Sequence, residues 1–271
     1  MASEATIRIS DHAMGGAVVR ELCLAAERGP NVFSGQMIAS LARALDEAER
    51  QETVAALIFS HTGKAFCAGT DLSELVALQD DQSALRAFLA SLIQLLRSIE
   101  RCRIPTIAAI EGAAVGGGLE LALACDLRIM SASAWAALPE TGLGTIPGGG
   151  GVQSLSRFIG RARTLSIVLT GMRLSAQECA DLGLAQLAAQ GAAREQAIEL
   201  GYKLAKGASR ALSAAKAIIL ASETATTAEL DRMALDAMIA TLTSPEGSEG
   251  LQSVAQRRKP DFLTARGQRG C

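Results

Sequence analysis

Apolar residues in the first half of the chain follow two different spacings. Over residues 35–50, behind Ser34, they recur every three or four positions, which predicts an amphipathic helix capped by the Ser34 hydroxyl. Short runs that are apolar throughout fit buried strands instead. Strands are predicted over 5–9, 17–25, 54–60, 106–110 and 127–130, with further helices over 85–99 and 117–124. Because strands and helices alternate, the pattern predicts an α/β core.

The pattern changes near residue 160 and is helical from there onwards. Helices are predicted over 162–170, 176–182, 193–206, 209–222, 228–242 and 246–257, and strand signals are weak. We therefore divide the chain into a core of residues 1–195 and a helical region of residues 196–271. No stretch rich in Pro, Gly or Ser separates the two, so we expect the helical region to pack tightly against the core.

Composition and charge exclude two classes of partner. The chain has 271 residues, of which 49% are hydrophobic, so it has enough apolar residues for a substantial core. Its 26 basic and 28 acidic residues nearly cancel. Since nucleic-acid phosphates need a concentrated basic face, we expect no nucleic-acid partner. No apolar run reaches the roughly 18 residues of a membrane helix, so we expect no membrane partner.

Cysteine and histidine usage limits other chemistry. The six cysteines form no C-x-x-C pair, and the two histidines, His12 and His61, belong to no metal-binding spacing. We therefore expect buried, reduced thiols and no metal site. The first residues show no basic segment followed by an apolar run, so we expect a cytoplasmic protein.

Two glutamates beside glycine-dense turns are the strongest candidates for chemistry. Glu120 lies in the first turn of the helix that starts after Gly116 and Gly117, and Glu140 opens a second glycine-rich run. Bare glycine backbone lets a ligand approach closely, and the start of a helix directs unpaired N–H groups towards it. Each feature also has an ordinary structural explanation: a tight turn, a helix–dipole contact for Glu120, and a solvated loop acid for Glu140.

A third glycine-bearing turn, over residues 64–72, precedes another helix and places Asp71 near its start. As structure, it is a helix entry. As chemistry, the Thr70 N–H is a second donor that converges with Gly117 on a developing oxyanion. Two donors and two carboxylates suit proton and water chemistry on an activated carbonyl compound.

These runs resemble the crotonase superfamily, the enoyl-CoA hydratase/isomerase fold, over almost the whole chain. The matching stretches are 64–72, 105–127, 139–155, 169–184, 249–251 and 256–262. The resemblance implies an α/β fold with a repeated ββα spiral core. It also implies a C-terminal helical region that builds trimers, often paired into hexamers.

The same resemblance implies a substrate and a reaction. Family members bind acyl-CoA thioesters and stabilise the thioester enolate with two backbone N–H groups, which map onto Thr70 and Gly117. In the two-glutamate hydratase branch, the carboxylates that act on one water map onto Glu120 and Glu140. The presence of both favours an enoyl-CoA hydratase, with Glu120 as the base for water and Glu140 as the proton donor in hydration.

Further substrate contacts follow from the resemblance. The CoA path is expected to run along Ala68, Asp71, Leu72 and Gly116. Arg257 or Arg258 is expected to meet a CoA phosphate, in the same or a neighbouring subunit, with a solvated tail as the structural alternative. CoA arrives as part of the substrate, so no separate cofactor is expected. Two alternatives stay open: an isomerase that shifts a double bond, which one glutamate can perform, and a non-catalytic CoA-binding protein that kept the fold.

Overall fold

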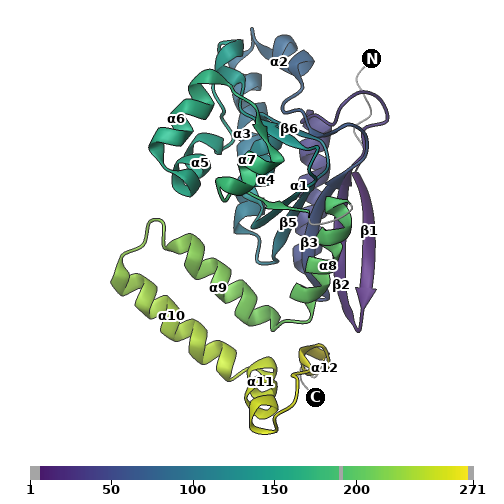
Figure 1. Ribbon diagram of the computed structural model, residues 1–271, viewed down its shortest axis with the longest axis vertical. Helices are drawn as coiled ribbons and strands as arrows, with labels where there is room; N and C mark the ends of the chain where they lie inside the picture. Colours follow the sequence, from purple (N-terminus) through teal and green to yellow (C-terminus); the bar gives the residue numbers. More distant parts are fainter. Residues whose placement is uncertain (1–6, 189–191, 268–271) are drawn as a thin grey trace.

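The computed structural model describes residues 7–188 and 192–267, and a six-stranded sheet lies at its centre (Figure 1). The strand order is β1-β2-β3-β5-β7-β10, in which β1 and β2 are antiparallel and all other neighbours are parallel. The strands are β1 (Ile7–Met14), β2 (Ala17–Leu24), β3 (Val54–His61), β5 (Thr106–Ile110), β7 (Leu127–Met130) and β10 (Gln186–Leu187).

A second, four-stranded sheet has the order β4-β6-β8-β9. Its strands are β4 (Ala65–Cys67), β6 (Ala113–Val115), β8 (Trp135–Ala137) and β9 (Leu174–Ser175). Each of the first three comes directly after a strand of the large sheet, and each is followed by helix. The chain therefore winds as a repeated strand–strand–helix spiral, which confirms the predicted α/β spiral fold.

Eleven regular α-helices and one short 3-10 helix accompany the sheets up to residue 255 in the described part of the chain, and a last helix follows them. They are α1 (Gly35–Arg50), α2 (Leu72–Leu78), α3 (Gln82–Arg101), α4 (Gly117–Ala124), η1 (Glu140–Leu143), α5 (Gly151–Ile159), α6 (Arg161–Thr170), α7 (Ala176–Asp181), α8 (Ala193–Ala205), α9 (Ser209–Ala221), α10 (Thr227–Leu242), α11 (Pro245–Ala255) and α12 (Phe262–Gly267). Helix α1 matches the predicted range, and the Ser34 hydroxyl accepts a hydrogen bond from the Met37 N–H as expected.

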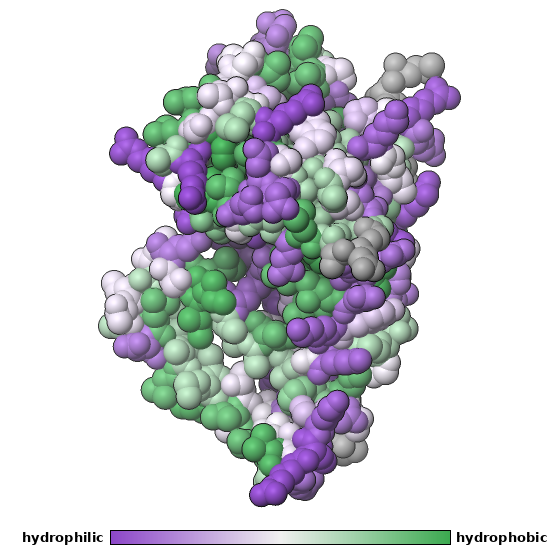
Figure 2. Space-filling view, in the orientation of Figure 1, coloured by the Kyte–Doolittle hydropathy of each residue, from purple (hydrophilic) through white to green (hydrophobic). Residues whose placement is uncertain are grey.

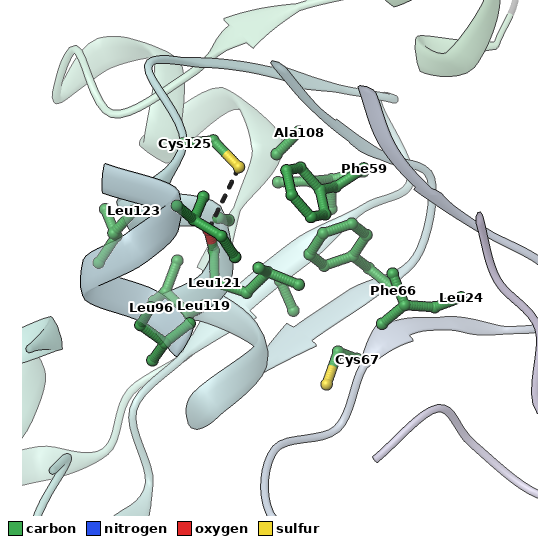
Figure 3. Packing of buried hydrophobic residues seen from close by; sticks show 14 of the residues in the cluster. Leu24, Phe59, Phe66, Cys67, Leu96, Ala108, Leu119, Leu121, Leu123 and Cys125 are labelled. Carbon is green, nitrogen blue, oxygen red and sulfur yellow. Dashed lines mark hydrogen bonds between the residues drawn. The ribbon is translucent and has the colours of Figure 1, made fainter. Parts of the chain in front are cut away.

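The main core lies between the large sheet and helices α1, α3 and α4. Figure 3 shows Phe59 of β3 and Phe66 of β4 beside Leu121 of α4, all of them less than 2% exposed. Leu and Ile side chains fill the remaining space, in keeping with the low aromatic content. This packing fixes α4, the helix that carries Glu120, against the strands.

The second face of the large sheet is covered by α8. Ala193, Ala197 and Ala205 of this helix pack against strand residues such as Val19 and Ile58. Contact is close because a Cβ on Gly201 would lie only 2.6 Å from a Val19 methyl group. The division at residue 195 falls inside α8, so the first residues of the proposed helical region belong to a helix that packs on the sheet.

The helices after α8 behave differently. Helices α9 and α10 have no buried residue in this chain, and Figure 1 shows them as a hairpin that extends away from the sheets. Within one chain, α9 meets the core through polar contacts, such as Lys216 with Asp126 (2.8 Å), and neither helix of the hairpin buries a residue. Helical spacing indicates that a face is apolar, but it does not tell which surface covers that face.

Two further predictions concern cysteines and membranes. The five cysteines in the described residues, at positions 23, 67, 102, 125 and 179, are free and buried, as predicted. Among the residues described, no helix combines the length and the apolar character that crossing a bilayer requires. The sequence pattern missed the strands of two or three residues, because such short strands depend on their neighbours rather than on their own periodicity. They are β4, β6, β8, β9 and β10.

Candidate active site

Two glycine turns from different spiral repeats meet at the N-terminus of α4. Gly69 adopts a φ of +94°, and a Cβ there would lie 3.1 Å from the Val115 carbonyl oxygen and 3.3 Å from the Gly117 nitrogen. Gly116 has a φ of +55° and packs against the Gly69 Cα. Only glycine tolerates both the positive φ and this approach of backbone to backbone. The Thr70 and Gly117 peptides are therefore brought together, as the sequence predicts.

The backbone around Thr70 leaves its N–H available. Phe33 forms a parallel bridge with Thr70, in which the Phe33 N–H donates to Gly69 (2.8 Å) and the Asp71 N–H donates to Phe33 (3.0 Å). Gly117 is the first residue of α4, where an N–H has no partner within the helix. Within residues 7–188 and 192–267, neither the Thr70 N–H nor the Gly117 N–H donates to a protein acceptor. Both are free to bind an anionic oxygen.

Phe33 also explains why residue 117 has no side chain. A Cβ on Gly117 would lie 3.1 Å from Cδ2 of the Phe33 ring. The buried ring therefore closes one side of the turn and leaves the N–H side open. The sequence analysis did not assign a role to Phe33, since its position beside α4 depends on the long-range bridge to Thr70.

Glu120 is a buried carboxylate held by backbone. It lies one turn into α4 and is only 4% exposed. Its Oε1 accepts hydrogen bonds from the Gly149 N–H (2.8 Å) and the Gly151 N–H (2.9 Å). The sequence analysis linked this glycine run with Glu140, whereas the structure shows that its N–H groups hold Glu120.

Glu140 is the first residue of η1 and is half-buried. A Cβ on Gly116 would lie 2.8 Å from its Oε1, so the carboxyl group lies directly over the Gly116 turn. Its Oε2 is buried and has no hydrogen-bond partner in the described part of the protein. An unsatisfied buried carboxyl oxygen is costly, so a function for it is expected.

The two carboxyl groups differ in what stabilises their charge. Burial, together with the nearby Glu120 charge, raises the pKa of Glu140 to about 7. Burial also raises the pKa of Glu120, but the N–H groups of the Gly149–Gly151 run and the charge of Arg97 oppose that rise. Near neutral pH the pair can therefore hold one proton, with Glu140 as the protonated member.

The other predicted contact residues divide into two groups. Ala68, Asp71 and Leu72 flank Thr70: Asp71 caps α2 by accepting from the Ser73 N–H (2.9 Å), and Leu72 is 59% exposed beside it. Arg257 follows α11, which lies at the opposite end of the molecule from α2 (Figure 1). Within one chain Arg257 therefore cannot meet a substrate at Thr70, and its predicted role stays a prediction for contact from a second copy.

Large apolar side chains are exposed on the elements that follow Thr70 and Glu140. Val76 of α2 is 65% exposed, and Leu143 and Ile146 after Glu140 are 64% and 71% exposed. No group of three or more His, Cys, Asp or Glu side chains in the described residues could hold a metal ion. The site thus offers two N–H donors, two carboxyl groups and nearby apolar surface.

Comparison with known proteins identifies the family. The enoyl-CoA hydratase/isomerase family matches residues 17–265 of the chain. The chain belongs to this family. Proteins of the family act on acyl-CoA thioesters, so the free N–H donors and the carboxyl pair lie in an enzyme of the crotonase type.

Individual relatives carry both hydratase and isomerase names. The chain is 38% identical over 235 residues to "Probable enoyl-CoA hydratase 2, mitochondrial" of Arabidopsis thaliana, a match that covers 85% of this chain and 76% of the relative. It is 38% identical over 211 residues to "Enoyl-CoA isomerase/hydratase fer4" of Mycosarcoma maydis, covering 76% and 75%. The crystal structure of an enoyl-CoA hydratase from Bacillus anthracis is similar with a TM-score of 0.87 and 32% identity, covering 95% of this chain and 98% of that one.

Proposed function

We propose that this protein is an enoyl-CoA hydratase, which reversibly adds water to a 2-enoyl-CoA thioester to give a 3-hydroxyacyl-CoA. The observation that carries the proposal is the contrast between the two carboxyl groups. Glu120 is bound by two backbone N–H groups that favour its charged form, whereas Glu140 is buried without such donors at Oε2. Hydration needs one base and one acid, and this pair supplies them.

The proposed steps follow from the geometry. The thioester oxygen binds the Thr70 and Gly117 N–H groups, Glu120 takes a proton from water, and the oxygen of that water bonds to C3. The electron pair of the double bond moves onto the thioester oxygen as an enolate, and Glu140 then donates its proton to C2. Loss of one such N–H donor typically costs about 3–4 kcal/mol of transition-state stabilisation. The CoA part of the substrate stays unchanged, so the steps use no separate cofactor.

The test is a hydration assay with crotonyl-CoA, followed by the loss of the conjugated thioester absorbance. We expect fast loss with the wild-type protein and a severe decrease with both Glu120→Gln and Glu140→Gln. If both variants kept near-normal turnover, the proposal would be wrong. The alternative is an isomerase, which the unpartnered Oε2 of Glu140 also suits because one carboxyl group can carry a proton between two carbons. Incorporation of ¹⁸O from labelled water into the product distinguishes hydration from isomerisation.

We also propose that the chain assembles as a homotrimer or as a hexamer built from two trimers. Exposed apolar side chains on the C-terminal helices support this, and Figure 2 shows hydrophobic surface over α9 and α10. The residues are Ile219, Leu235, Met238, Ile239, Leu242, Leu251 and Val254. Apolar surface gathered in this way is typical of an interaction face. Light scattering coupled to size-exclusion chromatography would measure the mass, and a monomer would contradict the proposal.

A further inference from the structure

A cation lies against the glycine run that holds the Glu120 carboxylate. Arg97 of α3 packs on Gly150, since a Cβ there would lie 3.3 Å from its Nη2 and 3.5 Å from its Cζ. Gly150 is the peptide between the two glycines whose N–H groups bind Glu120. The guanidinium therefore braces the glycine run that holds the carboxylate.

Arg97 and Glu120 also face the same small space. A cavity of ≈ 10 Å³ is lined by both residues, together with Leu96, Glu100, Gly149 and Ser154. The Arg97 side chain is 32% exposed, so solvent reaches its outer part while its head group lies against the glycine run. A positive charge in this position acts on the carboxylate through a mostly buried region, where electrostatic interactions are screened weakly.

Arg97 is the first residue of a series of ion pairs. Its Nη1 contacts Glu100 Oε2 at 2.5 Å, Glu100 Oε1 lies 3.9 Å from Arg157 of α5, and Arg157 contacts Glu223 at 2.6 Å. Glu223 follows α9, in the turn that leads to α10. These ion pairs therefore connect Arg97, beside the glycine run that holds Glu120, to the C-terminal hairpin.

The other charges near Glu120 do not replace Arg97. Glu100 from α3 is negative and is shared between Arg97 and Arg157 of α5. Glu140 from η1 interacts electrostatically with Glu120, and a charge on Glu140 would disfavour ionisation of Glu120. Burial raises the pKa of Glu120, and the positive charge of Arg97 opposes that rise together with the Gly151 and Gly149 N–H groups. No corresponding cation opposes the raised pKa of Glu140.

We propose that Arg97 is a positioning residue that braces the Gly149–Gly151 run and keeps Glu120 ionised, so that the two carboxyl groups hold their one proton on Glu140. This inference rests on the proposed hydratase function, in which Glu120 is the base. Arg97 contacts Gly150 and Glu100, so it acts on the reaction through Glu120.

The test is the pH profile of kcat for hydration of crotonyl-CoA by Arg97→Gln. The active form needs Glu120 charged and Glu140 protonated. Loss of the nearby cation makes Glu120 harder to ionise, so the acid limb of the profile moves to higher pH while the alkaline limb stays. On the acid side, we expect the loss to reach about tenfold for each pH unit by which the limb moves, and on the alkaline side we expect little loss. A loss that is equal at every pH would overturn the proposal, since a merely structural defect has that signature.

Two variants provide controls. Arg97→Lys keeps the charge and is expected to restore most of the acid limb. Arg101→Gln removes an exposed arginine one turn further along α3 and is expected to follow the wild type. If Arg101→Gln shifted the acid limb as far as Arg97→Gln, a general loss of positive charge would be responsible and the proposal would fail.

A second readout does not depend on turnover. In protein labelled with [5-¹³C]glutamate, the Glu120 carboxyl signal is assigned by its loss in Glu120→Gln and is then titrated. We expect it to titrate at higher pH in Arg97→Gln than in wild type, and an unchanged titration would overturn the inference even if activity fell. If the wild type did not hydrate enoyl-CoA but the titration still shifted, the proposed function would fail while the effect of Arg97 on Glu120 would stand.

Discussion

The turns around Glu120 and the α9–α10 hairpin differ in how much of their surface is buried within one chain. At Glu120 the chain closes on itself: glycines pack against backbone, and the carboxylate is bound within the same chain. In the hairpin, helices of 13 and 16 residues have no buried residue at all. The comparison teaches that one copy of the chain is enough to bury and bind Glu120, whereas it leaves apolar side chains of the C-terminal helices exposed.

The largest effect should come from Glu120→Gln. Glutamine keeps the size of the side chain and can still accept hydrogen bonds from the glycine run, but it cannot take a proton from water. We expect kcat to fall by about 10³-fold, within the range of general acid–base catalysis. Stopped-flow or steady-state loss of crotonyl-CoA absorbance measures this. Unchanged thermal unfolding would show that the loss is chemical rather than structural.

A methyl group in the glycine run should have the next largest effect. A Cβ on Gly149 would lie 2.5 Å from Leu96 Cδ1 and 2.6 Å from Glu120 Oε2, so Gly149→Ala must displace the carboxylate. We expect kcat to fall by about 10²-fold and the stability to fall by about 1–3 kcal/mol. Gly142→Ala is the matched control, because a Cβ there meets nothing within 4 Å. Equal behaviour of the two variants would show that the close fit at Gly149 has no functional role.

The hydration rate should depend on pH through the titration of Glu140. Because burial raises the pKa of Glu140 to about 7, its protonated fraction decreases as the pH rises through neutrality. We expect the hydration rate to fall by about tenfold per pH unit well above 7. In Glu140→Gln the residual rate should lose this alkaline limb, since glutamine does not titrate. A wild-type rate that stayed flat from pH 7 to pH 9 would contradict the assignment of Glu140 as the acid.

The smallest effect on the folding of one chain is expected in the hairpin. Leu235 and Ile239 of α10 are 58% and 55% exposed, so Leu235→Asp with Ile239→Asp removes little buried surface within the chain. Each change should alter the stability of one chain by no more than about 0.5 kcal/mol. The mass of the assembly should nevertheless decrease, as measured by light scattering. Ile9→Asp on β1, which is 48% exposed, is the control and should leave the mass unchanged.

Local features of the site were predictable from sequence, whereas the contacts between residues far apart in the chain were not. The Ser34 cap, the apolar run of β5 and the start of α4 depend on neighbouring residues, and all three were predicted. The hydrogen bonds from Gly149 and Gly151 to Glu120 join positions about 30 residues apart, and the bridge between Phe33 and Thr70 spans a similar distance along the chain. Such contacts leave no periodic signal, and neither does the packing of Arg97 on Gly150.

The packing of the hairpin formed by α9 and α10 also depends on contacts that the sequence does not show. Helices α9 and α10 were predicted at nearly their observed ranges, but their spacing did not show that neither buries a residue within one chain. An apolar stripe on a helix shows only that some partner surface covers it. Helix α8 has similar spacing but packs on the sheet, where its Gly201 lies close to Val19.

The buried thiols have a practical consequence for measuring motion in this protein. Burial raises the pKa of Cys67, Cys102, Cys125 and Cys179 to about 12, so hardly any thiolate exists in the closed fold at neutral pH. An alkylating reagent can therefore react only when the surrounding structure opens. Cys67 lies in β4 just before the Thr70 turn, and Cys125 caps the C-terminus of α4. The rate at which each is modified would therefore measure how often the structure around it opens, without an introduced cysteine.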